Sequence, residues 1–238
     1  NSHMNNENGY YVGFNFQPFK KWYLNGFFDL YRFPWLRYQV NSPSFGYETI
    51  AQLIYRPSKT LEVYFRFRTK SKQLNESAGL SQDHIRHIEN EHRTYYRFNL
   101  TYNINTDIEL RNRLEYVRYK RGKSDVEQGF LIYQDVIYKP LSFPLSFSAR
   151  LAYFDTDSYN SRIYAYENDV LNAFSFPAYY YRGMKAYLTI RYKAYKGIDF
   201  WFRVSNLFYG NKNEIGSGLE KISGKHRTDV KLQLRFTI

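Results

Sequence analysis

The chain has 238 residues, with 34 Lys and Arg against 22 Asp and Glu, no cysteine, and 26 Tyr, 20 Phe and 3 Trp. This aromatic content is far above ordinary globular usage and excludes a disordered chain, since such chains are poor in aromatic residues. Mean hydropathy is −0.64, and no window holds the ~18 uninterrupted apolar residues of a transmembrane helix. The lack of cysteine excludes a disulfide scaffold and a thiolate metal site. A folded chain with a net charge of +12 remains, which suits an anionic partner.

The first residues are polar and lack the apolar run of a secretory signal. We expect residues 1–8 to be a disordered tail. Within it, Ser2-His3-Met4 resembles the scar of a cloning tag, or else it is native sequence inside a longer chain. Residues 9–238 are predicted to form one β-barrel domain, for the reasons that follow.

The dominant pattern in residues 9–238 is alternation of apolar and polar residues with a period of two, which places successive side chains on opposite faces of a strand. In residues 60–70, for example, Val63 and Phe65 alternate with Glu62 and Tyr64. The pattern recurs along the whole chain. It predicts strands near residues 9–17, 22–33, 46–56, 60–70, 93–103, 108–120, 126–139, 145–155, 183–194, 198–209 and 227–238.

The length of these strands indicates a membrane. Strands of a soluble sandwich are usually ~5 to 6 residues long, whereas a tilted strand needs ~9 to 11 residues to cross the hydrocarbon layer. Aromatic residues gather towards strand ends, as in residues 31–35 and 179–181, which is typical of interfacial girdles. A closed barrel also satisfies every strand edge, as lipid demands. The sequence therefore predicts an all-β fold, a transmembrane antiparallel up-and-down β-barrel in the bacterial outer membrane, in contact with the lipid bilayer and lipopolysaccharide.

Connection lengths alternate along the chain, as expected for short periplasmic turns and longer extracellular loops. The short connections are residues 18–21, 57–59, 104–107, 140–144 and 195–197. The number of predicted strands is odd, whereas bacterial single-chain barrels have even numbers. We therefore expect about 11–12 strands in this chain and keep two resolutions open.

The first resolution is an extra hairpin formed by residues 162–170 and 173–181, which gives twelve strands if residues 9–17 do not span the membrane. The second is that the chain is the C-terminal part of a larger even-stranded barrel. The family resemblance described below favours the second resolution.

Basic residues outnumber acidic ones on the predicted polar faces. The candidate lumen-lining residues are Arg66, Arg68, Arg97, Arg111, Arg113, Arg150, Lys185, Arg191, Arg203, Lys231 and Arg235. A passage lined by Arg favours anions, because guanidinium groups bind carboxylate and phosphate bidentately. The alternative is a lattice in which Arg and Glu of neighbouring strands pair and fill a narrow lumen.

The connection at residues 156–182 is dense in recognition chemistry. Its candidate recognition residues are Arg162, Tyr164, Tyr166, Glu167 and Asp169. We expect this segment to fold inward and constrict the lumen or to meet a partner, with a simple extra hairpin as the alternative.

Metal and catalytic sites have only weak candidates. His84, His87 and Glu91 would share a face if their segment were helical, which gives a permissive metal-ligand set. A solvated polar loop is the alternative. Nucleophilic catalysis needs a base within reach of its nucleophile, and no histidine lies inside a predicted lipid-facing strand beside a serine. We predict a non-enzymatic protein with no catalytic residue, no bound metal and no cofactor.

Several stretches spread over most of the chain carry a family resemblance. They are Phe33-Pro34-Trp35-Leu36-Arg37-Tyr38, Ser42-Pro43-Ser44-Phe45-Gly46-Tyr47, Arg162-Ile163-Tyr164-Ala165-Tyr166-Glu167-Asn168-Asp169-Val170, Pro177-Ala178-Tyr179 before Gly183, and Ile215-Gly216-Ser217-Gly218-Leu219. They resemble the C-terminal part of Bacteroidetes outer-membrane proteins that carry helix-hairpin-helix motifs in their N-terminal region. The resemblance implies a signal peptide, a helical N-terminal region and earlier strands, none of them in this sequence. Because helix-hairpin-helix modules commonly contact the nucleic-acid backbone, the resemblance also implies that the full-length protein contacts nucleic acid through that module.

The last strand alternates up to Phe236 and Ile238, which resembles the C-terminal signal read by the barrel-assembly machinery, with Ile238 in place of a terminal aromatic residue. We therefore expect that machinery as a partner during biogenesis, and other outer-membrane subunits as further partners. Three functions stay open. They are a porin-like pore, transport or envelope-assembly component; a membrane anchor for a nucleic-acid uptake or binding module; and a soluble β-rich ligand-binding barrel.

Overall fold

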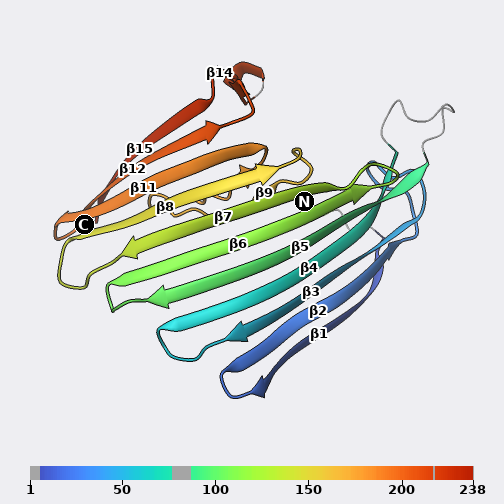
Figure 1. The fold of residues 1–238 in the computed structure, drawn as a ribbon, viewed down its shortest axis with the longest axis horizontal. Helices are drawn as coiled ribbons and strands as arrows, with labels where there is room; N and C mark the ends of the chain where they lie inside the picture. The colour runs from blue at the N-terminus through green and yellow to red at the C-terminus, as the bar shows by residue number, and fades with distance from the viewer. Residues whose placement is uncertain (1–5, 77–86, 217, 238) are drawn as a thin grey trace. The chain divides into compact units, whose positions relative to one another are not determined.

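A computed structural model describes residues 6–76, 87–216 and 218–237. Its main element is one sheet of eleven strands, which follow one another in the order β1-β2-β3-β4-β5-β6-β7-β8-β11-β12-β15 (Figure 1). Neighbours whose register is resolved pair antiparallel. The predicted all-β class and the up-and-down arrangement are therefore confirmed. Within the described ranges, no helix is long and apolar enough to cross a membrane.

The strands of the main sheet are 11 to 16 residues long. They are β1 (Asn8–Phe19), β2 (Trp22–Phe33), β3 (Ser44–Tyr55), β4 (Leu61–Asn75), β5 (Ile88–Asn103), β6 (Ile108–Arg121), β7 (Glu127–Tyr138), β8 (Leu145–Thr156), β11 (Arg182–Tyr195), β12 (Ile198–Tyr209) and β15 (His226–Phe236). Four short strands form two pairs outside this sheet, namely β9 (Ile163–Tyr164) with β10 (Ala178–Tyr179), and β13 (Glu214–Ile215) with β14 (Ile222–Ser223). A single 3-10 turn, η1 (Gly218–Glu220), is the helical element of the described residues.

The twelve-strand interpretation is wrong. Residues 162–170 and 173–181 contribute only the two-residue strands β9 and β10, which pair with each other and not with the main sheet. Residues 9–17 belong to β1, which pairs with β2 along most of its length. The physical reason is that residues 162–181 form hydrogen bonds and ion pairs with side chains on one face of the main sheet, as shown below, and do not pair with its strands.

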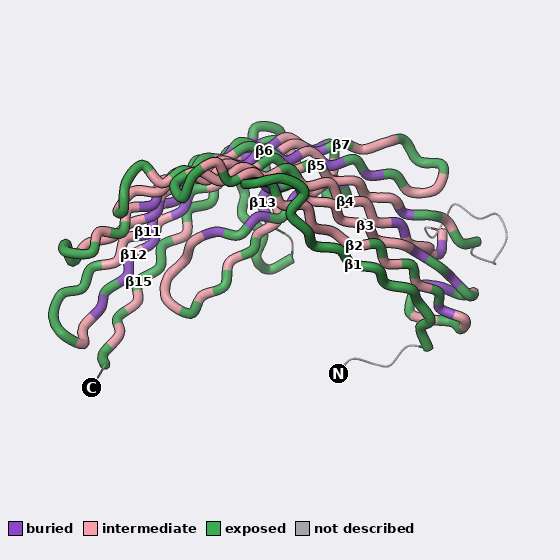
Figure 2. Tube along the Cα trace, turned by 90° about the horizontal axis from the view of Figure 1, so that it is seen from below, coloured by how far each residue is buried: buried purple, intermediate pink, exposed green. Residues whose placement is uncertain are grey.

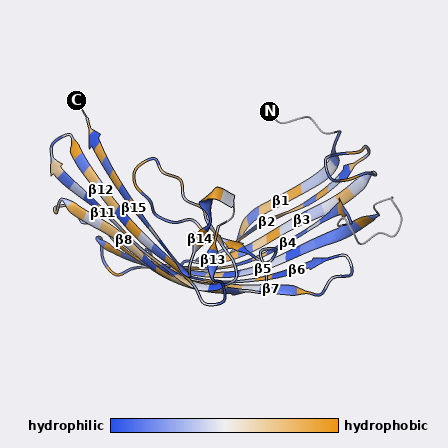
Figure 3. Cartoon of the chain, turned by 90° about the horizontal axis from the view of Figure 1, so that it is seen from above, coloured by the Kyte–Doolittle hydropathy of each residue, from blue (hydrophilic) through white to orange (hydrophobic). Residues whose placement is uncertain are grey.

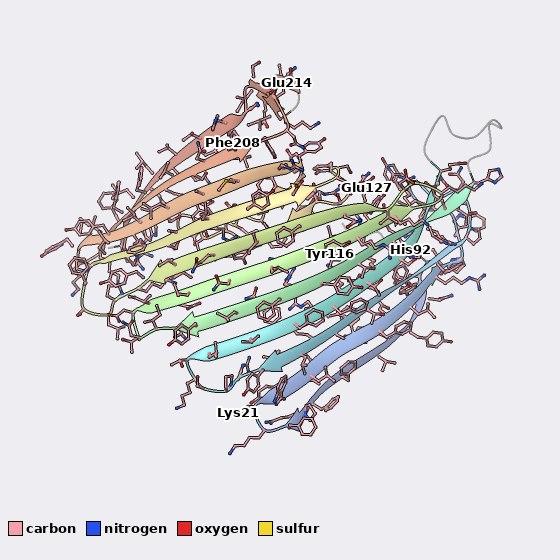
Figure 4. All side chains as sticks on the ribbon, viewed as in Figure 1. Lys21, His92, Tyr116, Glu127, Phe208 and Glu214 are labelled. Atoms are coloured by element: carbon pink, nitrogen blue, oxygen red, sulfur yellow. The ribbon has the colours of Figure 1, made fainter. Side chains whose placement is uncertain are left out.

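β4 and β5 are longer than predicted and extend into the connection between residues 70 and 93. β4 continues through Asn75, and β5 begins at Ile88, so that His92 lies inside a strand (Figure 4). The main-chain N–H of Glu76 donates to the carbonyl of His87 at 2.7 Å, which joins the two strands at their ends. Alternation missed this extension because polar residues occupy both faces here, as in Ser71-Lys72-Gln73.

Contacts divide the chain into two compact units. Unit 1 comprises residues 1–55, 64–97 and 116–128. Unit 2 comprises residues 56–63, 98–115 and 129–238. The two units are described separately below.

In unit 1, strands β1, β2 and β3 carry an exposed apolar face. Val12 lies opposite Phe28, which lies opposite Thr49, and both apolar side chains are exposed. The other face is polar, with Asp29 of β2 opposite Glu48 of β3. β1 is exposed along its whole length (Figure 2).

Unit 2 shows the same two-faced character more strongly. On one face Leu151 of β8 and Leu232 of β15 are 57% and 66% exposed. On the opposite face Arg150 of β8 and Arg203 of β12 are only 4% and 3% exposed. Hydrophilic and hydrophobic residues alternate along these strands (Figure 3). Charge is therefore buried while apolar side chains are exposed, which reverses the polarity of a sheet in a water-soluble protein.

Candidate functional site

The connection between β8 and β11 lies against the polar face of unit 2. Residues 157–181, which we call the inner hairpin, double back on themselves through the pairs Tyr164–Ala178 and Glu167–Ser175. Its residues alternate in burial, because Ile163 and Glu167 are fully buried whereas Tyr164 is exposed. One face of the inner hairpin therefore rests on the sheet and the other faces away from it.

Guanidinium groups of the sheet hold the backbone of the inner hairpin. Arg113 on β6, Arg150 on β8 and Arg203 on β12 each donate a hydrogen bond to one of its main-chain carbonyls. The accepting oxygens belong to Tyr164, Tyr166 and Asn168, at 3.0, 2.7 and 3.2 Å respectively. Hydrogen bonds with one charged partner are roughly twice as strong as neutral ones. Three separate strands thus fix the position of one segment.

Glu167 is the centre of the contact. Its carboxylate, fully buried, accepts from Arg203 Nη2 at 2.6 Å and from the Tyr179 hydroxyl at 2.6 Å, and it lies 2.7 Å from Lys185 Nζ. Burial and the neighbouring carboxylate raise the pKa of Tyr179 well above its usual value, so the hydroxyl stays protonated and donates. A buried carboxylate with three donors is a satisfied charge.

Asp169 makes a second ionic contact two residues further along. Lys231 Nζ on β15 lies 2.7 Å from its carboxylate, and Arg203 Nε lies 3.8 Å from it. The Asn168 N–H between these two acids donates to the Tyr187 hydroxyl at 3.1 Å. Charged and polar groups of β11, β12 and β15 therefore all contact the same three residues of the inner hairpin.

A buried ion pair joins β7 and β8 on the same polar face. Arg150 donates to both carboxylate oxygens of Asp135 on β7, at 2.5 and 2.6 Å, and both side chains are 2% exposed. The guanidinium carbon lies 3.6 Å from the centre of the Tyr133 ring, a cation–π contact. Arg150 thus links β7, β8 and the inner hairpin through one side chain.

The predicted lumen residues of unit 2 are all ion-paired. Arg111, Arg113, Arg150, Lys185, Arg191, Arg203, Lys231 and Arg235 each meet a carboxylate. Asp199 serves two of them, since it pairs with Arg191 at 2.8 Å and also with Arg235. In unit 2 the basic residues therefore form a paired lattice.

The three predicted lumen residues of unit 1 lie on strands β4 and β5. Arg68 lies 2.5 Å from Glu48, which also pairs with Lys70 at 2.9 Å. Arg66 Nε donates to Gln52 Oε1 at 2.5 Å. Arg97 is half-buried on β5. Each of the three has a strand position compatible with the polar face predicted from alternation.

The five predicted recognition residues divide between the two faces of the inner hairpin. Glu167 and Asp169 face the sheet in ion pairs, as described above. Tyr164 and Tyr166 are 37% and 43% exposed. Arg162 donates to the Tyr164 hydroxyl at 2.8 Å and stacks over Tyr159, with 4.1 Å to the ring centre. The acidic pair therefore anchors the hairpin, and the other three residues are available to solvent.

The weak metal candidate lies only partly within the described residues. His84 lies outside the described residues, and Glu91 lies in strand β5 and not on a helix, so the helical spacing on which the prediction rested is wrong. Glu91 instead pairs with Lys72 at 3.3 Å and Arg93 at 3.5 Å. Within the ranges that the structure describes, no group of three or more His, Cys, Asp and Glu side chains could hold a metal ion.

Two carboxylates of the site, Asp135 and Asp199, were not predicted from the sequence. Asp135 was not assigned to the polar face because β7 is apolar on both faces, with Leu131 and Ile137 on the same side as Asp135. Asp199 lies at the start of β12, where alternation is weakest. Asp135 lies directly opposite Arg150 on the neighbouring strand, and Asp199 lies opposite Lys193, two residues from Arg191, so a search for acidic residues near these basic positions would have found both.

The fold and this site define an all-β protein with a buried polar face and a hairpin fixed on it. No protein-family description matches the sequence, and no curated protein matches it. Among solved structures, the chain is similar to one described as "KdgM porin in complex with disordered oligogalacturonate", at 14% sequence identity and a TM-score of 0.34. The match covers 98% of this chain and 92% of that one.

Proposed function

We propose that this chain is a non-enzymatic outer-membrane β-barrel protein that acts as a porin-like pore, a transport component or a component of envelope assembly. The observation that carries the proposal is the reversed polarity of its long strands. Strands of 11 to 16 residues are long enough to cross the hydrocarbon layer. Their exposed face is apolar and their opposite face is charged, which is the arrangement of lipid-facing and lumen-facing residues.

β15 illustrates the argument. Val230, Leu232, Leu234 and Phe236 all point to one side, and they are 59%, 66%, 52% and 66% exposed. Water-soluble monomers rarely expose large contiguous apolar surfaces. The same face continues onto β12, where Val204 and Phe202 lie opposite Val230 and Leu232. Lipid tails would cover this surface without any polar partner, and this observation disfavours the soluble ligand-binding alternative.

The polar face supports a narrow passage with weak anion preference. Eight basic residues of unit 2 pair with six carboxylates, which leaves a small positive excess. The inner hairpin covers part of that face. An anion is therefore favoured by electrostatics but meets a constriction, which fits both the anion path and the paired lattice expected from the sequence.

Ionic current through a planar bilayer tests the transport part of the proposal. We expect a small, steady conductance whose reversal potential in a salt gradient shows mild anion selectivity. Strong cation selectivity would contradict the assignment of the basic face to the lumen. No current at all would remove the pore and leave the assembly role.

Replacement of Leu151 by arginine tests lipid contact. A lipid-facing arginine near the bilayer midplane costs about 2–4 kcal/mol, whereas an exposed position in a soluble protein changes stability by about 0.5 kcal/mol or less. We expect the urea midpoint of L151R in lipid vesicles to fall accordingly. Lys120→Arg, at an exposed position that is already charged, is the matched control and should leave the midpoint unchanged. Equal midpoints for L151R and the parent would contradict lipid contact at this face.

A second candidate function is a membrane anchor for a nucleic-acid module. The net charge of +12 and the resemblance to helix-hairpin-helix outer-membrane proteins favour it. Binding to DNA should then weaken steeply with salt, because cations on the protein release counterions from the phosphates. Filter binding across a salt series is the measurement, and negligible, salt-independent binding by the full-length protein would remove this candidate.

A further inference from the structure

A cavity of about 370 Å³ lies beside the inner hairpin in unit 2. Asn168 and Asp169 of the hairpin form one wall, and the turn with Pro140 and Pro144 forms another. Strands β8, β11 and β12 supply the rest. This volume is near the lower end for ligand pockets, which are typically ~300–1,000 Å³.

The cavity contains positive charge that its surroundings do not neutralise. Lys139 and Lys193 line its rim as exposed residues, and among the described residues neither ammonium group has a hydrogen-bond or ion-pair partner. Arg191 also lines it, and its carboxylate partner Asp199 is shared with Arg235. The one acid in the wall, Asp169, is already paired with Lys231 and Arg203. The cavity is therefore electropositive.

The register places these groups on one face. Arg191 lies opposite Ser146 on β8 and opposite Trp201 on β12, and Lys193 lies opposite Asp199. The Ser148 hydroxyl adds a neutral donor to the same wall, whereas the Thr189 hydroxyl donates to the Asn168 carbonyl at 3.2 Å. Ammonium, guanidinium and hydroxyl groups around a cavity are the donor set that binds carboxylate and phosphate.

We infer that this cavity binds a small organic anion with two or more carboxylate or phosphate groups. Two free ammonium groups and a half-neutralised guanidinium favour a multivalent anion over a monovalent one, because each charge can meet its own partner. The apolar side chains of the 140–144 turn, Leu141 and Phe143, would contact the body of the ligand. The inference rests on the proposed function, in which the polar face is exposed to water, and adds a specific anion-binding site along the proposed anion path.

Isothermal titration of the folded full chain in detergent tests the inference, with citrate and inorganic phosphate as anionic probes and glycerol as the neutral control. The test variant is K139Q/K193Q. The control is K196Q/K225Q, which removes the same charge from exposed positions outside the cavity. We expect citrate to bind the parent and the control alike, and to bind the test variant at least about tenfold more weakly, since a charged hydrogen bond contributes about 1.5–3 kcal/mol.

Binding of citrate alone would support a carboxylate ligand, and binding of phosphate as well would support either anion. Absence of binding to the parent, or an equal loss in both double variants, would overturn the inference. Thermal melting of each variant shows that it is folded. The titration is independent of the current measurement. Citrate binding without conductance would contradict the pore and support the anion site. Conductance without citrate binding would support the pore and contradict the anion site.

Discussion

Replacing Arg150 with alanine should lower the free energy of unfolding by about 3–5 kcal/mol, the usual cost of removing one partner of a buried ion pair. The change leaves the Asp135 carboxylate, 2% exposed, without its two charged hydrogen bonds. It also removes the donor to the Tyr166 carbonyl and the cation over Tyr133. Urea unfolding in detergent micelles, followed by tryptophan fluorescence, measures the change.

Two further variants test the cause of that loss. Arg68→Ala breaks an ion pair whose Arg is 41% exposed, and Glu48 keeps Lys70, so its cost should be below about 1 kcal/mol. The double variant R150M/D135L removes both charges and should recover most of the stability, because well-packed apolar residues replace buried pairs at little cost. A loss below about 1 kcal/mol for R150A would contradict the structure of this pair.

Replacing Glu167 with alanine should release the inner hairpin. The change leaves Arg203 and Lys185 without their closest carboxylate and removes the acceptor of the Tyr179 hydroxyl. A loss of about 3–5 kcal/mol raises the population of the detached hairpin about 10²- to 10⁴-fold. Trypsin cleavage after Arg162, a half-buried arginine of the hairpin, should accelerate accordingly, and the conductance of the pore should increase.

Glu214→Ala is the matched control for this prediction. Glu214 is also paired with a lysine, Lys221, but its side chain is 59% exposed and it lies outside the inner hairpin. This variant should keep the parental cleavage rate and conductance. If E167A showed the parental cleavage rate after Arg162, the inner hairpin would be fixed by contacts other than the Glu167 carboxylate.

The main strands were predictable because their alternation has a single physical cause. In β8, Leu151 and Tyr153 are exposed while Ala152 and Phe154 are buried, and burial follows the period of two from Phe147 to the end of the strand. In β15 the residue types alternate in the same way, although most of its residues are exposed. Where both faces carry the same kind of residue, alternation gives no register. The start of β5 at Ile88 was therefore missed, and in β7, whose bounds were predicted, Asp135 was not assigned to the polar face.

The inner hairpin shows why its partners could not be predicted. Ile163, Ala165 and Glu167 alternate with Tyr164 and Tyr166 as regularly as in any spanning strand. The local sequence therefore predicts that this segment is extended, but not which part of the protein it packs against. The neighbour is chosen by the basic residues of β8, β11 and β12, which lie far away in the sequence and bind its acids and carbonyls.

The central claim is that the apolar face of the sheet contacts lipid. The chain has no cysteine, so single cysteines carry unique fluorescent labels. We would label Leu151→Cys and Val204→Cys on the apolar face, and Ala152→Cys and Ser205→Cys as the adjacent residues on the polar face, in vesicles with spin-labelled lipid tails. The account predicts strong quenching at positions 151 and 204 and weak quenching at 152 and 205. Equal quenching within each adjacent pair, or quenching at none of the four, would contradict it.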